Sequence, residues 1–548
     1  MGTPGRGHDA IFVGAGINAL VGAALLTLAG WDVCVLEREA RLGGCIYTSD
    51  ELTLPGFTHE LLAAWHPLFT GSAAYAELKG ELDRRGVEYL NCELPTGSVF
   101  PDGSASFIWT AMDRQVAELD RHAAGDGSAW QAMFDGFMRN ADTAFGLLST
   151  ELWSLDGLSL AQRAFRRLGR RGMLEFAGQT LISCRDWVSS TFQSEQARGL
   201  LAPWVLHTGL GPDQAASGFM AQVIACALQV GGMPIPRGGG ARLVEALAGI
   251  VRDGGGELRT RATVERVLVS GGRACAVKLA GGETISASRA IVASVTPQAL
   301  YRGLLAEGDS PPATASAAAR FRHGRAEMQI HLALDAPPKW KGPRAAELER
   351  CPIVHVTDGL DGVSRAVNEA ERGLLPAAPT IVCGQPCVLD PARAPDGKAI
   401  IWIQLQELPP GRLKGDACAE IDVADGRWTQ TLREAYADRV ISRLGNALEN
   451  LDASILKRVV LSPADIEGLN VNLVGGDIYG GSCALDQSLL WRPFARATGH
   501  RTVVERLWHI GASTHPGAGL GAGSGYLVAK ALTRPTTARR VRERLRRP

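Results

Sequence analysis

Two glycine-rich stretches at opposite ends of the chain have the residue types that hold an anionic cofactor. The first runs GAGINA from Gly14 to Ala19, and the second, residues 510–525, places six glycines in sixteen positions. Glycine lets a backbone turn tightly and approach a phosphate, and a helix that starts just afterwards offers free N–H groups and the positive end of its dipole. Both stretches therefore predict contact with a phosphorylated or electron-rich group.

The elements around the first stretch are typical of a dinucleotide-binding unit. Residues 10–13 are apolar and β-prone, a helix follows the turn, and residues 33–36 form a second short strand. Glu37 stands at the end of that strand, where a carboxylate accepts hydrogen bonds from ribose hydroxyls and repels a 2′-phosphate. The pattern predicts a Rossmann-type unit whose cofactor contacts are Gly14, Ala15, Gly16, Asn18, Ala19 and Glu37.

The residues after Glu37 distinguish between kinds of dinucleotide. Residues 36–48 read LEREARLGGCIYT, which places Glu37, Arg41 and the pair Gly43-Gly44 in an E-x-x-x-R-x-G-G run. This run resembles that of the FAD-dependent amine oxidase and phytoene desaturase superfamily. The resemblance implies FAD as cofactor, with the glycine pair passing over its diphosphate and ribityl region. Cys45 stands where those families have Arg or Ala, and we expect a buried, unreactive thiol. The further cofactor contacts expected here are Arg38, Arg41, Gly43, Gly44 and Cys45.

The second stretch resembles the C-terminal signature of bacterial phytoene desaturases. Residues 514–519 read THPGAG and match it, while Ser513 replaces a glycine. The resemblance implies that this turn and its helix face the flavin ring, so that both stretches belong to one FAD site. A helix N-terminus there stabilises the negative charge of a reduced flavin. The contacts implied are Gly511, Ala512, Ser513, Gly519 and Leu520, with Val264 meeting the adenine through its backbone.

Two other runs narrow the resemblance to one branch. Residues 55–60 (PGFTHE) and 475–493 (GGDIYGGSCALDQSLLWRP) are similar to the branch of pyridine nucleotide-disulphide oxidoreductase domain-containing proteins. Within the second run, Asp486 and Gln487 either orient the cap domain or are plain turn residues.

The order of these blocks predicts a discontinuous architecture. A chain of 548 residues exceeds the size of one hydrophobic core. Residues 232–300 read as a helix followed by short strands with turn signals. We therefore expect an α/β fold with an α+β cap: a Rossmann-type FAD-binding domain from residues 1–100, 232–300 and 495–548, and an inserted substrate or cap domain from residues 101–231 and 301–494. RGGGARL at 237–243 is either part of the cofactor site or a helix-initiating turn.

The acid–base candidates are mostly histidines. Transfer of a hydride to a flavin needs a base only when the substrate also loses a proton. His515, beside Pro516 in the second stretch, is the predicted catalytic residue, acting on the cofactor or the substrate. Structural roles are expected for the other candidates, which are His59, Glu60, His66, His207, His331 and His509.

Bulk composition excludes several classes of function. The 57 basic and 57 acidic residues cancel, so a nucleic-acid partner is not expected. The 11 cysteines follow no zinc or redox spacing, which predicts reduced thiols in the cytoplasm and no metal site. No signal peptide or membrane-spanning run is predicted. Basic runs at 163–172 and 538–548 are interpreted as solvated surface, with peripheral contact of the C-terminal tail with an anionic membrane left open.

Three functions remain compatible with the sequence. The first is an FAD-dependent desaturase or dehydrogenase acting on a small, apolar molecule. The second is an FAD-dependent amine oxidase, and the third is a flavin-binding interaction protein with little turnover. No further G-x-G-x-x-G unit for NAD(P)H is visible in the sequence, so oxygen, a quinone or another external acceptor is expected to reoxidise the flavin.

Overall fold

A parallel sheet forms the frame of one half of the molecule in the computed structural model, which describes residues 7–534. Its central strand β1 pairs with β2 on one side and β12 on the other, and β9 and β20 extend it outward. All four pairings are parallel. The bounds are β1 His8–Val13, β2 Val33–Leu36, β9 Glu257–Arg259, β12 Thr284–Ser294 and β20 Leu507–Ile510.

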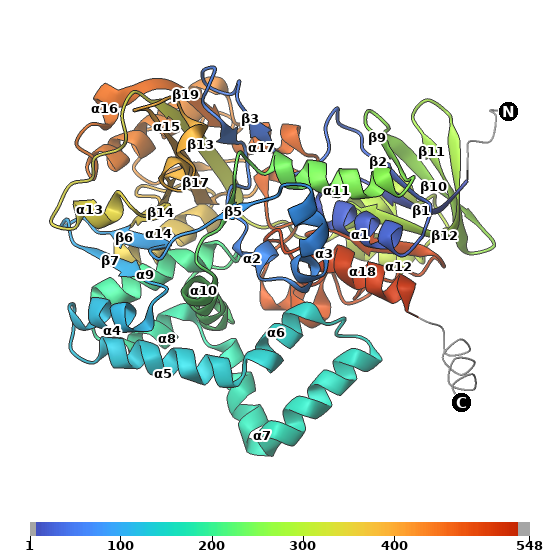
Figure 1. Ribbon diagram of the computed structural model, residues 1–548, viewed down its shortest axis with the longest axis horizontal. Helices are drawn as coiled ribbons and strands as arrows, with labels where there is room; N and C mark the ends of the chain where they lie inside the picture. Colours follow the sequence, from blue (N-terminus) through green and yellow to red (C-terminus); the bar gives the residue numbers. More distant parts are fainter. Residues whose placement is uncertain (1–6, 535–548) are drawn as a thin grey trace.

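Helices cover this sheet (Figure 1), and small side chains allow their close approach. In α1 (Ile17–Leu28) ten of the twelve residues are buried. A Cβ on Gly22 would lie 3.0 Å from the Phe12 ring and 3.3 Å from the Gly525 carbonyl oxygen, so α1 touches both β1 and the last helix. The helices beside it are α3 Ala73–Arg84, α11 Ala241–Asp253 and α18 Gly523–Thr533.

An antiparallel meander extends the same sheet at one edge. Strands β10 and β11 pair with each other, and β11 pairs with the first part of β12. The connection back to the second half of the molecule is a π-helical turn followed by α12. The bounds are β10 Val264–Ser270, β11 Arg273–Leu279, the π-helical turn Ala299–Leu304 and α12 Pro312–Ala319.

A second, largely antiparallel sheet forms the other half, in the order β19-β13-β17-β16-β14-β6-β7. Its adjacent strands β13 and β17 alternate in character: Ile330 and Ile403 point into an apolar core, whereas Gln329 and Gln404 pair on the opposite face. The bounds are β6 Thr96–Val99, β7 Ala105–Ile108, β13 Ala326–Leu334, β14 Ile353–Val356, β16 Ile381–Gly384, β17 Ala399–Leu408 and β19 Ile455–Leu461.

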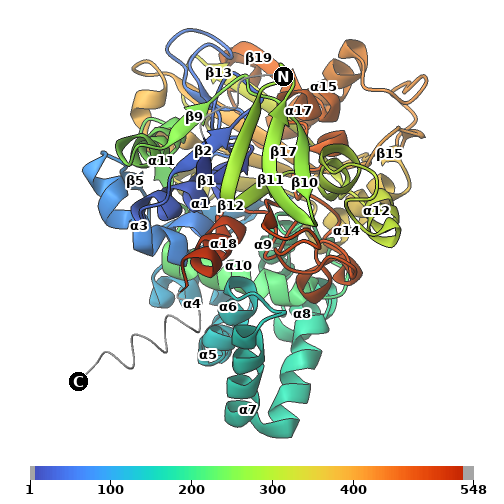
Figure 2. The same ribbon diagram turned by 90° about the vertical axis from the view of Figure 1, so that its right-hand side faces the viewer.

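A helical layer lies against the second sheet and continues into a projecting pair of helices, α6 and α7 (Figures 1 and 2). The bounds are α4 Met112–Asp120, α5 Asp126–Arg139, α6 Ala141–Ser149, α7 Leu155–Leu181, α8 Cys184–Thr191, α9 Glu195–Leu206, α10 Ser217–Gly231 and α14 Gly359–Glu371. The remaining helices of four residues or more are α2 Pro67–Thr70, α13 Ala345–Leu348, α15 Gln430–Gly445, α16 Leu451–Ser454 and α17 Pro463–Leu469. Two-residue strands complete the described chain: β3 Thr48–Ser49, β4 His59–Glu60, β5 Tyr89–Leu90, β8 Ile235–Pro236, β15 Leu374–Leu375 and β18 Gly415–Asp416.

The predicted fold class is confirmed: a Rossmann-type sheet is assembled from distant segments and joined to a second α/β unit. The domain limits stay a prediction. Strand β6 lies within the predicted 1–100 segment but pairs with β14 of the second sheet. Among residues 7–534, no helix is both long and apolar enough to cross a bilayer. The basic tail at 538–548 lies outside the described residues.

Candidate functional site

A cavity of about 720 Å³ lies at the carboxyl ends of the parallel strands and continues toward the second sheet. This volume is within the range of small-molecule and cofactor sites. Its walls combine residues from both ends of the chain: Gly14 and Glu37 from the first βαβ unit, Val264 from the meander, and Gly511 and Leu520 from the last turn. The two glycine-rich stretches therefore share one cavity.

The first turn offers bare backbone to this cavity. Gly14 has φ +95°, a conformation that favours glycine. Gly16 is the N-cap of α1 and places the free N–H groups of the helix at the cavity wall. A Cβ on Gly44 would lie 3.0 Å from Gly16 Cα, so the Gly43-Gly44 turn packs directly on the first turn. This is a cradle that fits a diphosphate: a Cβ on Gly16 would meet no protein atom within 4 Å and would take up part of the open space.

Glu37, the predicted ribose contact, lines the cavity beside this cradle. Its Oε2 accepts a 2.8 Å hydrogen bond from the Ala15 N–H, and its Oε1 accepts a 2.9 Å bond from the Glu39 N–H. Each carboxylate oxygen has a second lone pair for a ribose hydroxyl. Nearby, Arg41 donates to the Gly44 carbonyl and lies over the Tyr47 ring, which holds the glycine pair in position.

The last turn is tied to the first through side chains. The Gly511 N–H donates a 2.9 Å hydrogen bond to Ser524 Oγ, and the Ser524 hydroxyl donates a 2.8 Å bond to Asn18 Oδ1. The backbones are also in contact, since a Cβ on Gly525 would collide with the Asn18 carbonyl oxygen. One rigid unit therefore carries both turns.

The 475–493 run supports the last turn from the other side. Buried Asp477 accepts hydrogen bonds from the N–H groups of Tyr479 and Gly481. The Arg492 guanidinium, 2 % exposed, donates to the carbonyl oxygens of Tyr479 and Ala512, both at 2.7 Å. Arg492 thereby joins the loop of this run to the last glycine-rich turn.

Asp486 and Gln487 bind Arg322, which lies shortly before strand β13 of the second sheet. Asp486 pairs with Arg322 at 2.7 Å, and Gln487 accepts from the Arg322 N–H and donates to its carbonyl oxygen. Of the two alternatives for these residues, the orienting role agrees with these contacts.

The RGGG segment at 237–240 lies at the junction of the two halves. Gly238 donates to Asp390 Oδ2 at 2.7 Å and Gly240 donates to Glu60 Oε1 at 2.8 Å, and α11 begins directly afterwards. Buried Arg393 pairs with both carboxylates. These residues do not line the cavity. The segment is a helix-initiating turn fixed by a buried ion network.

The end of the cavity beside the second sheet is apolar and aromatic. Trp65 and Trp402 stack edge to face with ring centroids 5.1 Å apart, and Trp204 packs on His207 at 4.5 Å. The apolar side chains beside them are Leu62, Ile224, Leu228, Met233, Ile353 and Ile478. His207 Nε2 contacts His355 Nε2 at 3.1 Å, and burial lowers the His207 pKa to about 3, so this ring is neutral.

One carboxyl group lies in this largely apolar end. Glu327 projects from β13, and its two oxygens accept hydrogen bonds from the side-chain amides of Gln329 and Gln404, both at 2.5 Å. Burial raises the pKa of Glu327 to about 8, although the two amide donors lower it. Near pH 7 most Glu327 side chains are therefore neutral, and a smaller fraction is ionised.

Sequence reasoning missed Glu327 and Gln404. A signal was present, because AEMQIHLAL (326–334) and AIIWIQLQEL (399–408) alternate polar and apolar residues inside buried strands. Asn470 and Tyr479 were also not assigned to the site, although both line the cavity.

The predicted cofactor contacts cluster at this cavity. All of them line it except Ala19, which is buried inside α1, and Gly43, which packs against Ile46 and Val244. Burial raises the Cys45 pKa to about 11, so its thiol is protonated, as expected for an unreactive cysteine. The assignment of each residue to the cofactor stays a prediction.

His515 lies away from the cavity lining. Its ring is 2 % exposed, and burial lowers its pKa to about 4. The neighbouring groups are His500, which contacts the His515 carbonyl oxygen at 2.8 Å, and Glu151, which contacts His500 at 2.5 Å. This geometry favours a structural histidine, and a chemical role for His515 stays an untested prediction. The other histidine candidates, His59, His66, His331 and His509, are buried as well.

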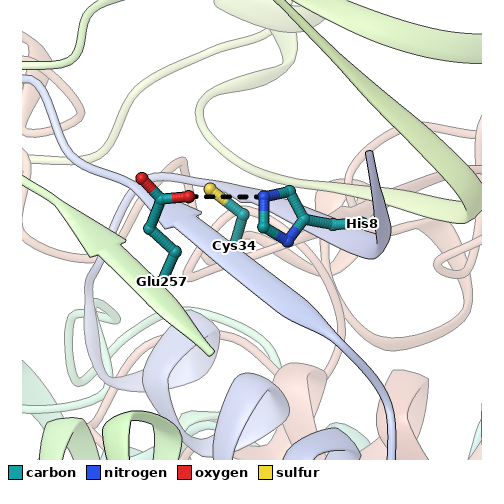
Figure 3. A group of neighbouring side chains, drawn as sticks. All are labelled: His8, Cys34 and Glu257. Atoms are coloured by element: carbon teal, nitrogen blue, oxygen red, sulfur yellow. Dashed lines mark ion pairs between the residues drawn. The ribbon is translucent and has the colours of Figure 1, made fainter. Parts of the chain in front are cut away.

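One further polar cluster lies at the opposite end of the parallel strands (Figure 3). His8, Cys34 and Glu257 bring potential metal-ligand atoms within 4.8 Å of one another. The His8 ring also contacts Asp32 at 3.0 Å and Glu257 at 3.4 Å. Burial raises the Cys34 pKa to about 12. A histidine placed between two carboxylates accounts for these contacts, and we assign no ion to them.

Comparison with known proteins agrees with this geometry. The family profile described as "Flavin containing amine oxidoreductase" matches residues 20–507. Pyridine nucleotide-disulfide oxidoreductase domain-containing protein 2 of Mus musculus is 25% identical, covering 96% of this chain and 93% of that protein. A limonene dehydrogenase subunit from Castellaniella defragrans is 24% identical (95% and 94% covered), and phytoene desaturase of Neurospora crassa is 24% identical (94% and 82% covered). An oxidoreductase structure from Methanosarcina mazei has a TM-score of 0.60 at 15% identity over 95% of this chain and 99% of that one.

Proposed function

Because the chain belongs to the family of flavin-containing amine oxidoreductases, we propose that it is a dehydrogenase or desaturase of a small, largely apolar organic substrate. The protein is an oxidoreductase, and its cofactor is FAD. The first glycine turn, the Gly43-Gly44 turn and the last turn would hold this group, since their bare backbone forms the cradle described above. Bound FAD supplies the two-electron acceptor, which takes a hydride equivalent at N5.

The observation that carries the proposal is the aromatic, apolar chamber continuous with this cradle. Trp65, Trp204 and Trp402 are among its walls, and Glu327 is the buried carboxyl there. Such walls exclude water and bind a hydrocarbon surface. Two of the relatives are named for the hydrocarbons limonene and phytoene, which agrees with this choice of substrate class.

Glu327 supplies the proton acceptor that such a reaction needs. When two hydrogens leave adjacent atoms, one departs as a hydride to the cofactor and the other as a proton, and a double bond forms in the substrate. The ionised Glu327 carboxylate accepts that proton, and Gln329 and Gln404 fix the orientation of its oxygens. Oxygen, a quinone or another external compound would serve as the final electron acceptor.

An amine oxidase is the alternative, and the family description favours it. Glu327, whose pKa is raised by desolvation, distinguishes between amine substrates and uncharged ones. A neutral carboxyl is a poor counter-ion for an ammonium substrate, so the chamber fits an uncharged molecule better. A flavoprotein with little turnover is the third candidate.

The test is a screen of a metabolite extract with purified holoenzyme and a quinone or oxygen. Formation of a compound two hydrogens lighter than an apolar precursor, lost in the Glu327→Gln variant, supports the proposal. Peroxide release with amines and no consumption of apolar compounds would establish the amine oxidase instead. Absence of any turnover, with the cofactor resistant to reoxidation by oxygen and quinone, would favour the interaction protein.

A further inference from the structure

Helices α6 and α7 form an arm that projects from the helical layer (Figures 1 and 2). We use "the arm" for residues 141–181. The long helix α7 is bent at Gly169, whose φ of +66° and ψ of −179° interrupt the helix. The arm therefore consists of α6, an outgoing half of α7 before Gly169 and a returning half after it.

Large apolar side chains on the arm face outward. Leu155 is 85% exposed, Leu158 66% and Phe165 55%, all on the outgoing half. Leu158 and Phe165 are seven residues apart and so share one helix face. Leu174 and Leu181, also seven apart, are exposed on the returning half, and Trp153 precedes α7 at 63% exposure. Monomeric proteins seldom expose so many large apolar side chains along one element.

The same segment is basic. Between Gly157 and Leu174 there are five arginines and no acidic residue. All five are exposed; they are Arg163, Arg166, Arg167, Arg170 and Arg171. Among the described residues, Arg166 and Arg170 have no ion-pair partner, and Arg171 has only a 3.9 Å contact with Glu175. Positive charge is thus interleaved with apolar side chains on the outer surface.

The fold holds the arm by its other face. Phe176 packs edge to face on Phe219 of α10, and Arg167 donates to Asn140, which precedes the arm. Within the arm, Leu160 and Ala164 are buried, and Arg167 also donates to Thr143 of α6. The exposed leucines and Phe165 belong to none of the apolar core clusters of the described chain. Their exposure is not required for folding.

We propose that the arm docks the protein on the surface of an anionic lipid bilayer. Helices that lie in the bilayer interface combine apolar side chains, which enter the acyl boundary, with arginines, which pair with anionic headgroups. The arm presents both on one projecting element. A bilayer requires only that combination, whereas a protein partner needs shaped, complementary pockets. This proposal does not depend on the reaction proposed above.

Helix α10 connects the arm to the cavity. It contacts α7 through Phe219 and lines the cavity with Ile224, Ala227 and Leu228. Leu68 on α2, which packs against α10, also lines the cavity and is 44% exposed. One helix therefore joins the arm to an apolar wall of the cavity.

The test is co-sedimentation of the full-length protein with phosphatidylcholine vesicles, with and without phosphatidylglycerol. One variant combines Leu155→Ser, Phe165→Ser and Leu174→Ser, and a second combines Arg166→Gln and Arg170→Gln. The matched control combines Leu28→Ser, Leu456→Ser and Val503→Ser, which are exposed apolar residues elsewhere. Visible flavin absorption and thermal melting establish that each variant is folded.

Wild type and control are expected to bind the anionic vesicles and to be released by salt. Each arginine near an anionic surface contributes about fivefold in affinity, so the arginine variant should bind at least tenfold more weakly. The serine variant should lose binding to the same degree. Equal binding by wild type and both arm variants, or no binding by wild type, would overturn the proposal. A change of oligomeric mass in the serine variant without a change in vesicle binding would instead assign the surface to contact between two copies.

Discussion

The Ser524 hydroxyl donates a 2.8 Å hydrogen bond to Asn18 Oδ1, across 506 positions of the chain. Ser524 in turn accepts a hydrogen bond from the Gly511 N–H. The last glycine-rich turn is therefore held against the start of α1, and the two turns line one cavity. A second nucleotide site is not needed to explain the glycines near the C-terminus.

Replacement of Ser524 by alanine should loosen this connection. The buried Gly511 N–H would lose its acceptor, which costs about 1–3 kcal/mol. We expect a lower melting temperature and faster release of FAD. The control is Ser316→Ala at an exposed position of α12, which should match wild type. Unchanged FAD release in Ser524→Ala would show that the two turns are held together by other contacts.

Replacement of Gly480 tests whether the 475–493 run holds the last turn in position. Its φ is +64°, and an added Cβ would lie 2.7 Å from the Ala512 Cβ. Gly480→Ala should displace the turn and cost about 1–3 kcal/mol in strain and clash. Purified protein is expected to contain much less FAD by absorption. Gly445→Ala, at a helical position with open space, is the control and should keep full FAD content.

The raised pKa of Glu327 predicts how turnover depends on pH. With a pKa of about 8, its carboxylate fraction rises roughly tenfold for each pH unit below that value. The rate under subsaturating substrate should therefore increase with pH and level off near the pKa. Glu327→Gln should lower the rate by about 10²–10⁴-fold and abolish this profile. A residual profile with the same pKa in the glutamine variant would assign the proton transfer to another group.

Glu327 also predicts a change of stability with pH. Its pKa is about 8 in the folded protein and 4.5 ordinarily, so folding favours the neutral form of this carboxyl group. The resulting stabilisation is fully present below pH 4.5 and is lost as the pH rises through 8. Between about pH 6 and 9, wild type should lose about 3 kcal/mol of unfolding free energy relative to Glu327→Gln. Denaturant unfolding of both proteins at the two pH values measures the difference. Parallel losses in both would mean that Glu327 is not buried as a neutral acid.

Local patterns in the sequence account for the cofactor half of the site. Gly14, Gly16 and Glu37 could be predicted because each acts within one strand–turn–helix–strand unit, where spacing determines position. Glu327 and Gln404 are 77 residues apart and meet only through the register of β13 with β17, which no local pattern specifies. The motif around His515 predicted a glycine-rich turn at the cavity, but His515 itself is not among the residues that line it, and its backbone carbonyl oxygen contacts His500.

The most direct test of the account is anaerobic reduction of the bound FAD by candidate substrates. An apolar isoprenoid-like hydrocarbon should bleach the visible flavin absorption of the wild-type protein, with one molecule two hydrogens lighter formed per flavin reduced. The Glu327→Gln variant should bind the same compound with little bleaching. Bleaching by primary amines, with no response to any hydrocarbon, would contradict the account.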